Sequence, residues 1–221
     1  MENNVKIKLE NKILEVVNEL KYLGVIIDKN LNFSAHVNYI GKKVGSKMGV
    51  LRRIGADLTP YMRCTVYKAI IAPIFEYCAS VLMGVTDTNL QYLQKLQNKG
   101  MRIILRCNKY VRITDMLNAL RFMSISERIE YNVCILVFKM VHGLSPNYLV
   151  NEIELVSNTE TVQTRQKGNI YINKCKTNEE QKMLLHDGFK MYNSLPKNVK
   201  DEQSLCSFKR ALVSCIKGGE R

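Results

Sequence analysis

The sequence predicts a mainly α-helical fold, in which a small antiparallel β segment precedes a helical bundle. A change in the spacing of apolar residues indicates this fold. Residues 1–30 contain short runs of β-forming residues. From residue 34 onward, apolar residues recur every three or four positions, as they do along one face of a helix. The 221 residues contain no repeat, and a chain of this length can bury about 70% of its unfolded surface.

The N-terminal segment is predicted to form a hairpin and a third strand. Residues 5–9 alternate apolar and polar side chains, residues 10–12 favour a turn, and residues 13–17 are again β-forming. The run 21–28 is almost continuously apolar, which predicts a strand with neither face fully in water. Three strands form a marginal sheet, so we expect this segment to need a neighbour.

The middle segment, residues 31–112, is predicted to be a helical bundle. An apolar stripe predicts a helix from residue 34 to about residue 55. Thr59 followed by Pro60 is typical of a helix start, because the threonine caps the helix and a proline in the first turn needs no N–H. Pro73 interrupts the second helical pattern and predicts a kink or a break.

The remaining residues, 113–221, are predicted to be a helical C-terminal extension. Thr114 is the predicted cap of a short helix, and Ser124 with Glu127 has the spacing of a capping box. A long polar loop is predicted near 156–178, with a short strand at 169–172 inside it. Two closing helices are predicted over residues 179–192 and 204–216.

Most of the positive charge lies in the middle segment. The chain has 33 Lys plus Arg and 20 Asp plus Glu, a formal net charge of +13. Residues 31–112 hold thirteen basic and three acidic residues, and so carry +10 of that total. This imbalance favours polyanionic partners, first nucleic acid and second an acidic membrane surface. The apolar runs are shorter than the ~18 residues of a membrane span, so no integral membrane protein is expected.

A predicted helix over residues 89–106, with Asp87 as its cap, carries four cations in one row. At 100° per residue they fall within an arc of about 60°. The row consists of Lys95, Lys99, Arg102 and Arg106. Such a row can follow phosphates, and neighbouring amides can add hydrogen bonds. The amides are Gln91, Gln94, Gln97 and Asn98, and the companion cations are Lys42, Lys43, Lys47, Arg52, Arg53 and Arg63. A solvated helix face is the alternative interpretation.

The motifs do not indicate a catalytic or metal centre. The seven Cys include no CxxC pair, and the three His stand at no zinc-ligand spacing from them. The six Asp are dispersed, whereas phosphoryl transfer by two metal ions needs clustered carboxylates. We therefore expect no catalytic residue, metal ligand or cofactor in the chain. The dispersed Cys are expected to be free thiols of an intracellular protein, in the nucleus or the cytoplasm.

Several short strings occur in an order that resembles one family. They begin with Lys21-Tyr22-Leu23-Gly24-Val25 and continue through Asp28, Leu31, Phe33 and His36 to Lys43 and the segments 49–52, 67–73, 75–78, 93–102, 144–149, 192–196 and 207–209. This order is similar to the part of reverse transcriptases that follows the catalytic palm in LINE-type, jockey-like non-LTR retrotransposons. The absence of Trp is a departure, because the family commonly has one near residues 81–84.

The resemblance implies both a role and an absence. In the family, the metal-binding aspartates precede the KYLG segment in an F.DD strand turn, so this chain is expected to begin after them. Mg²⁺ is expected only with the missing palm. Tyr22, Leu23 and Gly24 would position the primer end. Residues 1–30 would be the end of the palm, 31–112 a thumb that grips a template–primer of RNA or DNA, and 113–221 the extension.

The sequence is compatible with three alternative functions. The first is a fragment of an RNA-directed DNA polymerase that binds nucleic acid without polymerising. The second is a non-catalytic helical module that interacts with another protein, with the missing polymerase part or with a second copy of itself, because a truncated thumb leaves apolar surface uncovered. The third is an enzyme in its own right, which requires metal-dependent nucleotide incorporation.

Overall fold

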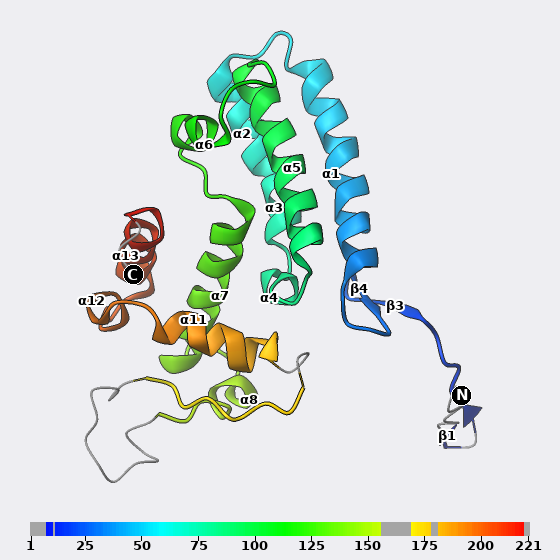
Figure 1. Ribbon diagram of the computed structural model, residues 1–221, viewed down its shortest axis with the longest axis vertical. Coiled ribbons are helices and arrows are strands. Elements are labelled where there is room, and N and C mark those ends of the chain that lie inside the picture. The colour runs from blue at the N-terminus through cyan, green and yellow to red at the C-terminus, as the bar shows by residue number, and fades with distance from the viewer. Residues whose placement is uncertain (1–7, 11, 156–168, 178–180, 219–221) are drawn as a thin grey trace.

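The computed structural model describes residues 8–10, 12–155, 169–177 and 181–218, and it confirms a mainly helical fold with a small β segment at its N-terminus (Figure 1). The longest helices of the N-terminal half, α1, α2 and α5, stand side by side along the long axis of the molecule. The hairpins lie beyond the start of α1, and α7 and α13 form the other side of the molecule.

The N-terminal segment forms two separate hairpins. The strands are β1 (Lys8–Leu9), β2 (Lys12–Ile13), β3 (Glu19–Tyr22) and β4 (Val25–Asp28), and each pair is antiparallel. The predicted single strand over 21–28 is wrong, because the chain reverses at Leu23 and Gly24, whose φ angles are 45° and 84°. Two successive positive φ angles match the twist of a two-residue hairpin turn. Residues 5–7 of the first predicted strand lie outside the described residues.

Helix α1 (Ser34–Ile54) follows a loop that Asp28 holds in place. The Asp28 carboxylate accepts hydrogen bonds from the backbone N–H groups of Asn30, Asn32 and Phe33, at 3.1, 3.2 and 2.6 Å. The predicted apolar stripe is buried, and consists of Val37, Ile40, Val44, Met48 and Leu51. The helix is therefore fixed at its start by one side chain and along its length by packing.

The second predicted helix is broken before its proline. Its parts are α2 (Pro60–Ile70) and α3 (Ala72–Glu76), and a short α4 (Ala79–Leu82) follows. Thr59 caps α2 as predicted, because its hydroxyl oxygen accepts the Met62 N–H at 3.3 Å. Pro73 lies in the first turn of α3, where its missing N–H needs no partner. The proline therefore begins a new helix and does not bend the old one.

Three further helices follow: α5 (Asp87–Leu105), α6 (Ile113–Leu120) and α7 (Ile125–Val141). Two predicted caps are wrong by a residue or two. Thr86 caps α5 in place of Asp87, and Arg112 occupies the cap position of α6 in place of Thr114. The capping box at the start of α7 is confirmed by bonds of 3.3 and 2.7 Å between Ser124 and Glu127.

The described helices of the C-terminal region pack on α7, except α12, which packs on α13. They are α8 (Asn147–Val150), the π-helix η1 (Leu184–Gly188), α11 (Phe189–Asn193), α12 (Lys197–Lys200) and α13 (Leu205–Gly218). The ring of Phe138 stacks on that of Phe208 at a centroid distance of 4.1 Å, and buried side chains form one continuous core from α1 to α13. Of the predicted polar loop, residues 156–168 and 178 lie outside the described residues, and the predicted strand is seen as a bridge between Leu155 and Ile170.

Within the described part of the chain, no helix combines the length and the apolar character that a membrane crossing requires.

Candidate nucleic-acid interface

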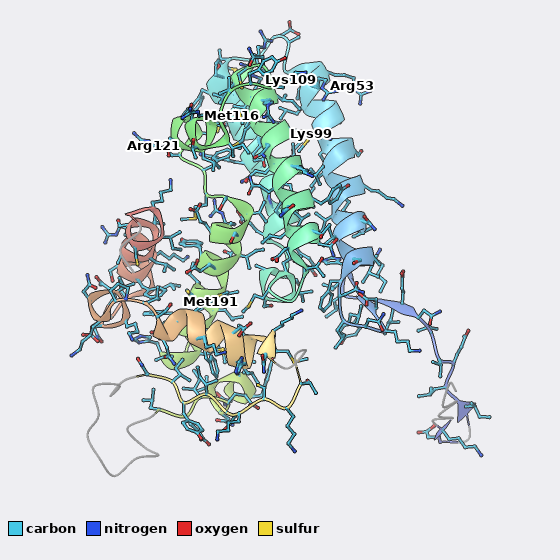
Figure 2. The ribbon with its side chains drawn as sticks, in the orientation of Figure 1. Arg53, Lys99, Lys109, Met116, Arg121 and Met191 are labelled. Atoms are coloured by element: carbon cyan, nitrogen blue, oxygen red, sulfur yellow. The ribbon has the colours of Figure 1, made fainter. Side chains whose placement is uncertain are left out.

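The predicted nucleic-acid-binding residues all lie on α1, on α5 or directly after α5. Both helices run in the same direction, and Figure 2 shows Arg53 and Lys99 in the half of the bundle where the two helices end. The helices touch closely at Gly41, where an added Cβ would overlap the hydroxyl of Tyr92. The residues are Lys42, Lys43, Lys47, Arg52 and Arg53 on α1, and Lys95, Lys99, Arg102 and Arg106 on or after α5.

The cations of α1 do not share one face. At 100° per residue, Arg52 lies on the same flank of α1 as Gly41, and this flank faces α5. Lys42 and Arg53 lie on the solvent side, whereas Lys43 lies on the opposite flank of the helix. Lys47 follows Lys43 one turn later. All five cationic side chains are exposed.

The predicted basic row of α5 divides into free and engaged cations. Lys95 and Lys99 are exposed and have no hydrogen bond or ion pair within the described residues. Arg102 is half-buried, and its Nη2 donates to the Lys109 carbonyl oxygen at 3.4 Å. Arg106 donates from Nη2 to the Gly55 carbonyl oxygen at 2.8 Å. The row is therefore present, but only its first half is unengaged.

Arg63 does not belong to the interface, which corrects its prediction as a companion cation. Its side chain is 3% exposed. The Nε atom donates to the Ile104 carbonyl oxygen at 2.8 Å, and Nη1 donates to the Leu58 carbonyl oxygen. The guanidinium thus joins the end of α5 to the loop between α1 and α2. Its partners are backbone carbonyls, so it stabilises the fold and presents no charge to a ligand.

Three of the four amides predicted beside the row point into the protein instead: Gln94, Gln97 and Asn98. Gln94 Nε2 donates to the other two amides at 2.8 Å, and its Oε1 accepts the Ile125 N–H at 2.9 Å. Gln97 Nε2 donates to the Met123 carbonyl oxygen at 2.8 Å. These bonds attach α5 to the start of α7, and they leave Gln91 as the exposed amide of the set.

Three regularly spaced glycines of α1 shape the surface between the free cations. Gly45 and Gly49 follow Gly41 at intervals of four residues, which carries them from the α5 flank toward solvent. A Cβ at either position would meet nothing within 4 Å. The backbone of α1 is therefore uncovered between Lys42 and Arg52, and a ligand can approach it closely.

The residues predicted to position a primer lie at the tip of the β3–β4 hairpin. Tyr22 and Leu23 are exposed, and the Tyr77 hydroxyl donates a hydrogen bond to the Leu23 carbonyl oxygen. Gly24 completes the turn, and a Cβ added there would lie 3.5 Å from the Tyr77 ring. This tip lies at the opposite end of α1 from Arg53. The two predicted sites are thus separated along one helix.

The described residues offer no set of ligands for a metal ion. No three His, Cys, Asp or Glu side chains come together among them. All seven Cys lie in the described part of the chain, and none forms a disulfide bond.

The structure defines a helical bundle with exposed cations on α1 and α5, and comparison with known proteins identifies its relatives. The chain is 32% identical over 127 residues to the probable RNA-directed DNA polymerase from transposon BS of Drosophila melanogaster. It is 31% identical over 116 residues to that from transposon X-element of the same species. It is 29% identical over 127 residues to the RNA-directed DNA polymerase from mobile element jockey of Drosophila funebris.

These matches confirm the resemblance to a fragment of a jockey-like, non-LTR reverse transcriptase. They cover 56%, 51% and 56% of this chain, but only 14%, 13% and 14% of the three relatives. No family model matches the chain, and no solved structure matches it.

Proposed function

We propose that this chain is the nucleic-acid-gripping part of a reverse transcriptase from a non-LTR mobile element, and that it does not polymerise by itself. The observation that carries the proposal is the outer α1–α5 face, which we define as Lys42, Arg52, Arg53, Lys95 and Lys99 with Gly45 and Gly49 between them. The resemblance to RNA-directed DNA polymerases supports the same function.

The outer α1–α5 face has the chemistry of a phosphate-binding surface. Its cations have no carboxylate partner among the described residues, so their charge is available to a ligand. Lys95 and Lys99 are one turn apart, about 6 Å along the helix axis. Cations spaced along a helix can neutralise successive phosphates and release their counterions. The open glycines let the sugar–phosphate backbone approach α1 without displacing a side chain.

A structural role explains some of these cations but not others. Arg52 and Arg53 lie in the last turn of α1, where positive charge stabilises the negative end of the helix dipole. That effect falls off within one turn. Lys42, Lys95 and Lys99 lie in the middle of their helices and gain nothing from it. The three lysines are therefore the decisive members of the face.

Polymerisation chemistry is assigned to another part of the polymerase. Two-metal phosphoryl transfer requires carboxylates that converge on the ions. Because the described carboxylates do not cluster, we place the magnesium ions in a palm outside these residues and assign binding alone to this chain.

The salt dependence of binding tests the proposal. Five phosphate contacts give a slope of log K against log salt of about 4.5 on duplex and about 3.5 on single strands. The triple variant Lys42→Gln, Lys95→Gln, Lys99→Gln should lower the slope by about 2.7 on duplex, measured by fluorescence anisotropy between 50 and 200 mM salt, a range in which such contacts are normally weakened.

The matched control removes the same charge elsewhere. Lys174, Lys197 and Arg210 are exposed residues of the C-terminal region, and changing all three to Gln also lowers the net charge by three. We expect this control to keep the slope of the unaltered protein. Equal losses in the two triple variants would show that net charge, and not the outer α1–α5 face, determines binding.

A second candidate function is favoured by the apolar surface of the N-terminal hairpins. Every residue of β3 is exposed, including Leu20 at 55% and Tyr22 at 61%. Strand β3 pairs with β4 on one edge, and its other edge has no strand partner among the described residues. A strand of another polymerase part, or of a second copy, would cover this surface.

Light scattering after size exclusion separates the two candidates. If the hairpin face mediates self-association, the protein is a dimer at micromolar concentration, and Leu20→Lys converts it to a monomer because a charge cannot be buried in that contact. A monomer that retains the predicted salt slope contradicts self-association and leaves nucleic-acid binding as the function. The matched control is Leu144→Lys, since Leu144 is equally exposed but lies beyond the end of α7.

A further inference from the structure

An aromatic ring extends into solvent from the loop that follows α5. The ring belongs to Tyr110, which is 80% exposed, and its hydroxyl has no hydrogen-bond partner among the described residues. Figure 2 shows the adjacent Lys109 at the end of the bundle that also carries Arg53. A single exposed tyrosine is ordinary on a protein surface, so its surroundings decide what it can bind.

The loop that carries Tyr110 is held at three points. Arg106 Nη2 donates to a carbonyl oxygen of the loop between α1 and α2 at 2.8 Å. Arg102 Nη2 donates to the Lys109 carbonyl oxygen at 3.4 Å, and the Tyr110 N–H donates to Asn108 Oδ1 at 3.0 Å. The ring is therefore presented from a fixed backbone, which lowers the entropy that is lost when a ligand binds it.

One face of the Tyr110 ring is occupied by a cation, and the other face is open. The Nζ atom of Lys109 lies 5.2 Å from the ring centroid, which is a cation–π contact. Because Tyr110 is so exposed, the described residues leave the second face of the ring uncovered. A flat group can stack there, and every nucleobase has such a face.

The basic row of α5 ends beside the Tyr110 loop. Arg102 belongs to this row, contacts the Lys109 carbonyl oxygen and lies about 4.5 Å along the helix axis from Lys99. Residues 106–112 hold three basic residues and no acidic one. This charge suits a phosphate backbone. A strand that is bound at Lys99 can therefore continue to Tyr110 without meeting a carboxylate of this loop.

We propose that Tyr110 stacks on an unpaired base of a nucleic-acid strand whose phosphates are bound by the outer α1–α5 face. The inference rests on the proposed function, because that face holds the strand, and it names single-stranded nucleic acid as the form that binds at the end of α5. Bases inside a duplex already stack on one another, so their faces are closed to the ring. Stacking tolerates every base, so no sequence preference is expected.

A single-stranded oligonucleotide that contains the fluorescent base analogue 2-aminopurine is the probe, because stacking quenches its emission. We expect saturable quenching when the protein binds. Tyr110→Leu should remove the quenching and weaken single-strand binding about tenfold, which corresponds to one stacked base. Tyr110→Phe keeps the ring, so it should retain both the quenching and the affinity. A circular duplex has no unpaired base and should bind all three proteins equally.

Tyr148→Leu is the matched control. Tyr148 is 70% exposed but lies on α8, which packs on α7 and not on α5. This variant should behave as the unaltered protein does. The proposal is overturned if Tyr110→Leu keeps the quenching, if Tyr110→Phe loses it, or if Tyr148→Leu weakens single-strand binding as much as Tyr110→Leu does.

The salt slope of the same single strand separates this inference from the proposed function. If the slope depends on Lys42, Lys95 and Lys99 but the quenching does not depend on Tyr110, the proposed function stands and the stacking contact is excluded. If the quenching depends on Tyr110 while the triple lysine variant keeps the full slope, the stacking contact is supported and the outer α1–α5 face is excluded.

Discussion

Two groups of cations lie in the same helical bundle, and the structure uses them in different ways. Lys42, Lys95 and Lys99 extend into solvent without a partner among the described residues. Arg63 and Arg106 instead end at backbone carbonyls around the loop between α1 and α2. The comparison shows that a count of positive charge in a segment combines residues whose charge is exposed and unpaired with residues that hold loops in place.

The chemistry of the two side chains explains the division. A guanidinium has five N–H donors in a fixed planar arrangement, so it can satisfy several carbonyls at once. Arg63 does this with the carbonyls of Leu58 and Ile104, and Gly55 is within 3.4 Å of its Nη1. A lysine ammonium on its flexible stem is a compact, strongly hydrated charge. It can therefore remain in water, as the exposed ammonium groups of Lys42, Lys95 and Lys99 do.

The largest effect on stability is expected from Arg63→Met. The substitution keeps an unbranched side chain in the core but leaves the Leu58 and Ile104 carbonyls without their donor, and buried acceptors without donors are costly. We expect a greater fall in Tm than for any other variant named here, measured by circular dichroism, with the slope of log K against log salt unchanged below the unfolding temperature.

Arg53→Met is the matched control for Arg63→Met, because it makes the same substitution at an exposed arginine. Arg53 is exposed and stabilises only the helix dipole, so its loss should lower Tm slightly and lower the slope on duplex by about 0.9. If Arg63→Met lowered the slope and Arg53→Met lowered Tm as much as Arg63→Met does, the division between structural and ligand-binding cations would be wrong.

A smaller loss of stability is expected from Gly41→Ala, which tests how α1 and α5 meet. The added methyl group overlaps the Tyr92 hydroxyl, so the two helices must separate or the ring must turn. Overpacking of this kind costs about 1–3 kcal/mol. Urea unfolding should show a lower midpoint with an unchanged m-value, since the same surface is exposed on unfolding.

Gly45→Ala is the matched control, one helical turn later. Its added methyl group meets nothing within 4 Å, and alanine in a helix is more stable than glycine by about 0.5–1 kcal/mol. The midpoint should therefore rise slightly. Equal changes at the two glycines would show that α5 does not lie against the Gly41 flank of α1.

Local signals explain which parts of the fold were predictable. The starts of α2 and α7 are set by Thr59 and by Ser124 with Glu127, whose partners lie within three residues. The break before Pro73 is equally local. The hairpin turn at Leu23 was not predictable from the apolar run, because leucine rarely adopts a positive φ angle and the tertiary contact with Tyr77 is distant in sequence.

The candidate site was predictable in its charges but not in their orientation. Lys95 and Lys99 could be placed on one helix face from their spacing alone. The inward turn of Gln94 and Gln97 depends on backbone groups 31 and 26 residues away, and the burial of Arg63 depends on a carbonyl 41 residues away. A helical wheel shows which side chains share a face, but the neighbours that cover that face come from the tertiary fold.

The hydrogen bond from Tyr77 to the Leu23 carbonyl attaches the tip of the β3–β4 hairpin, in addition to the bond from the Ile26 N–H to His36 Nδ1 on α1. Held only by the loop at Asp28 and by the contact of β4 with α1, the tip of the hairpin would be free to tilt. With its tip also fastened to α3, that tilt is blocked, and whatever docks along β3 is presented to α1 at a constant angle.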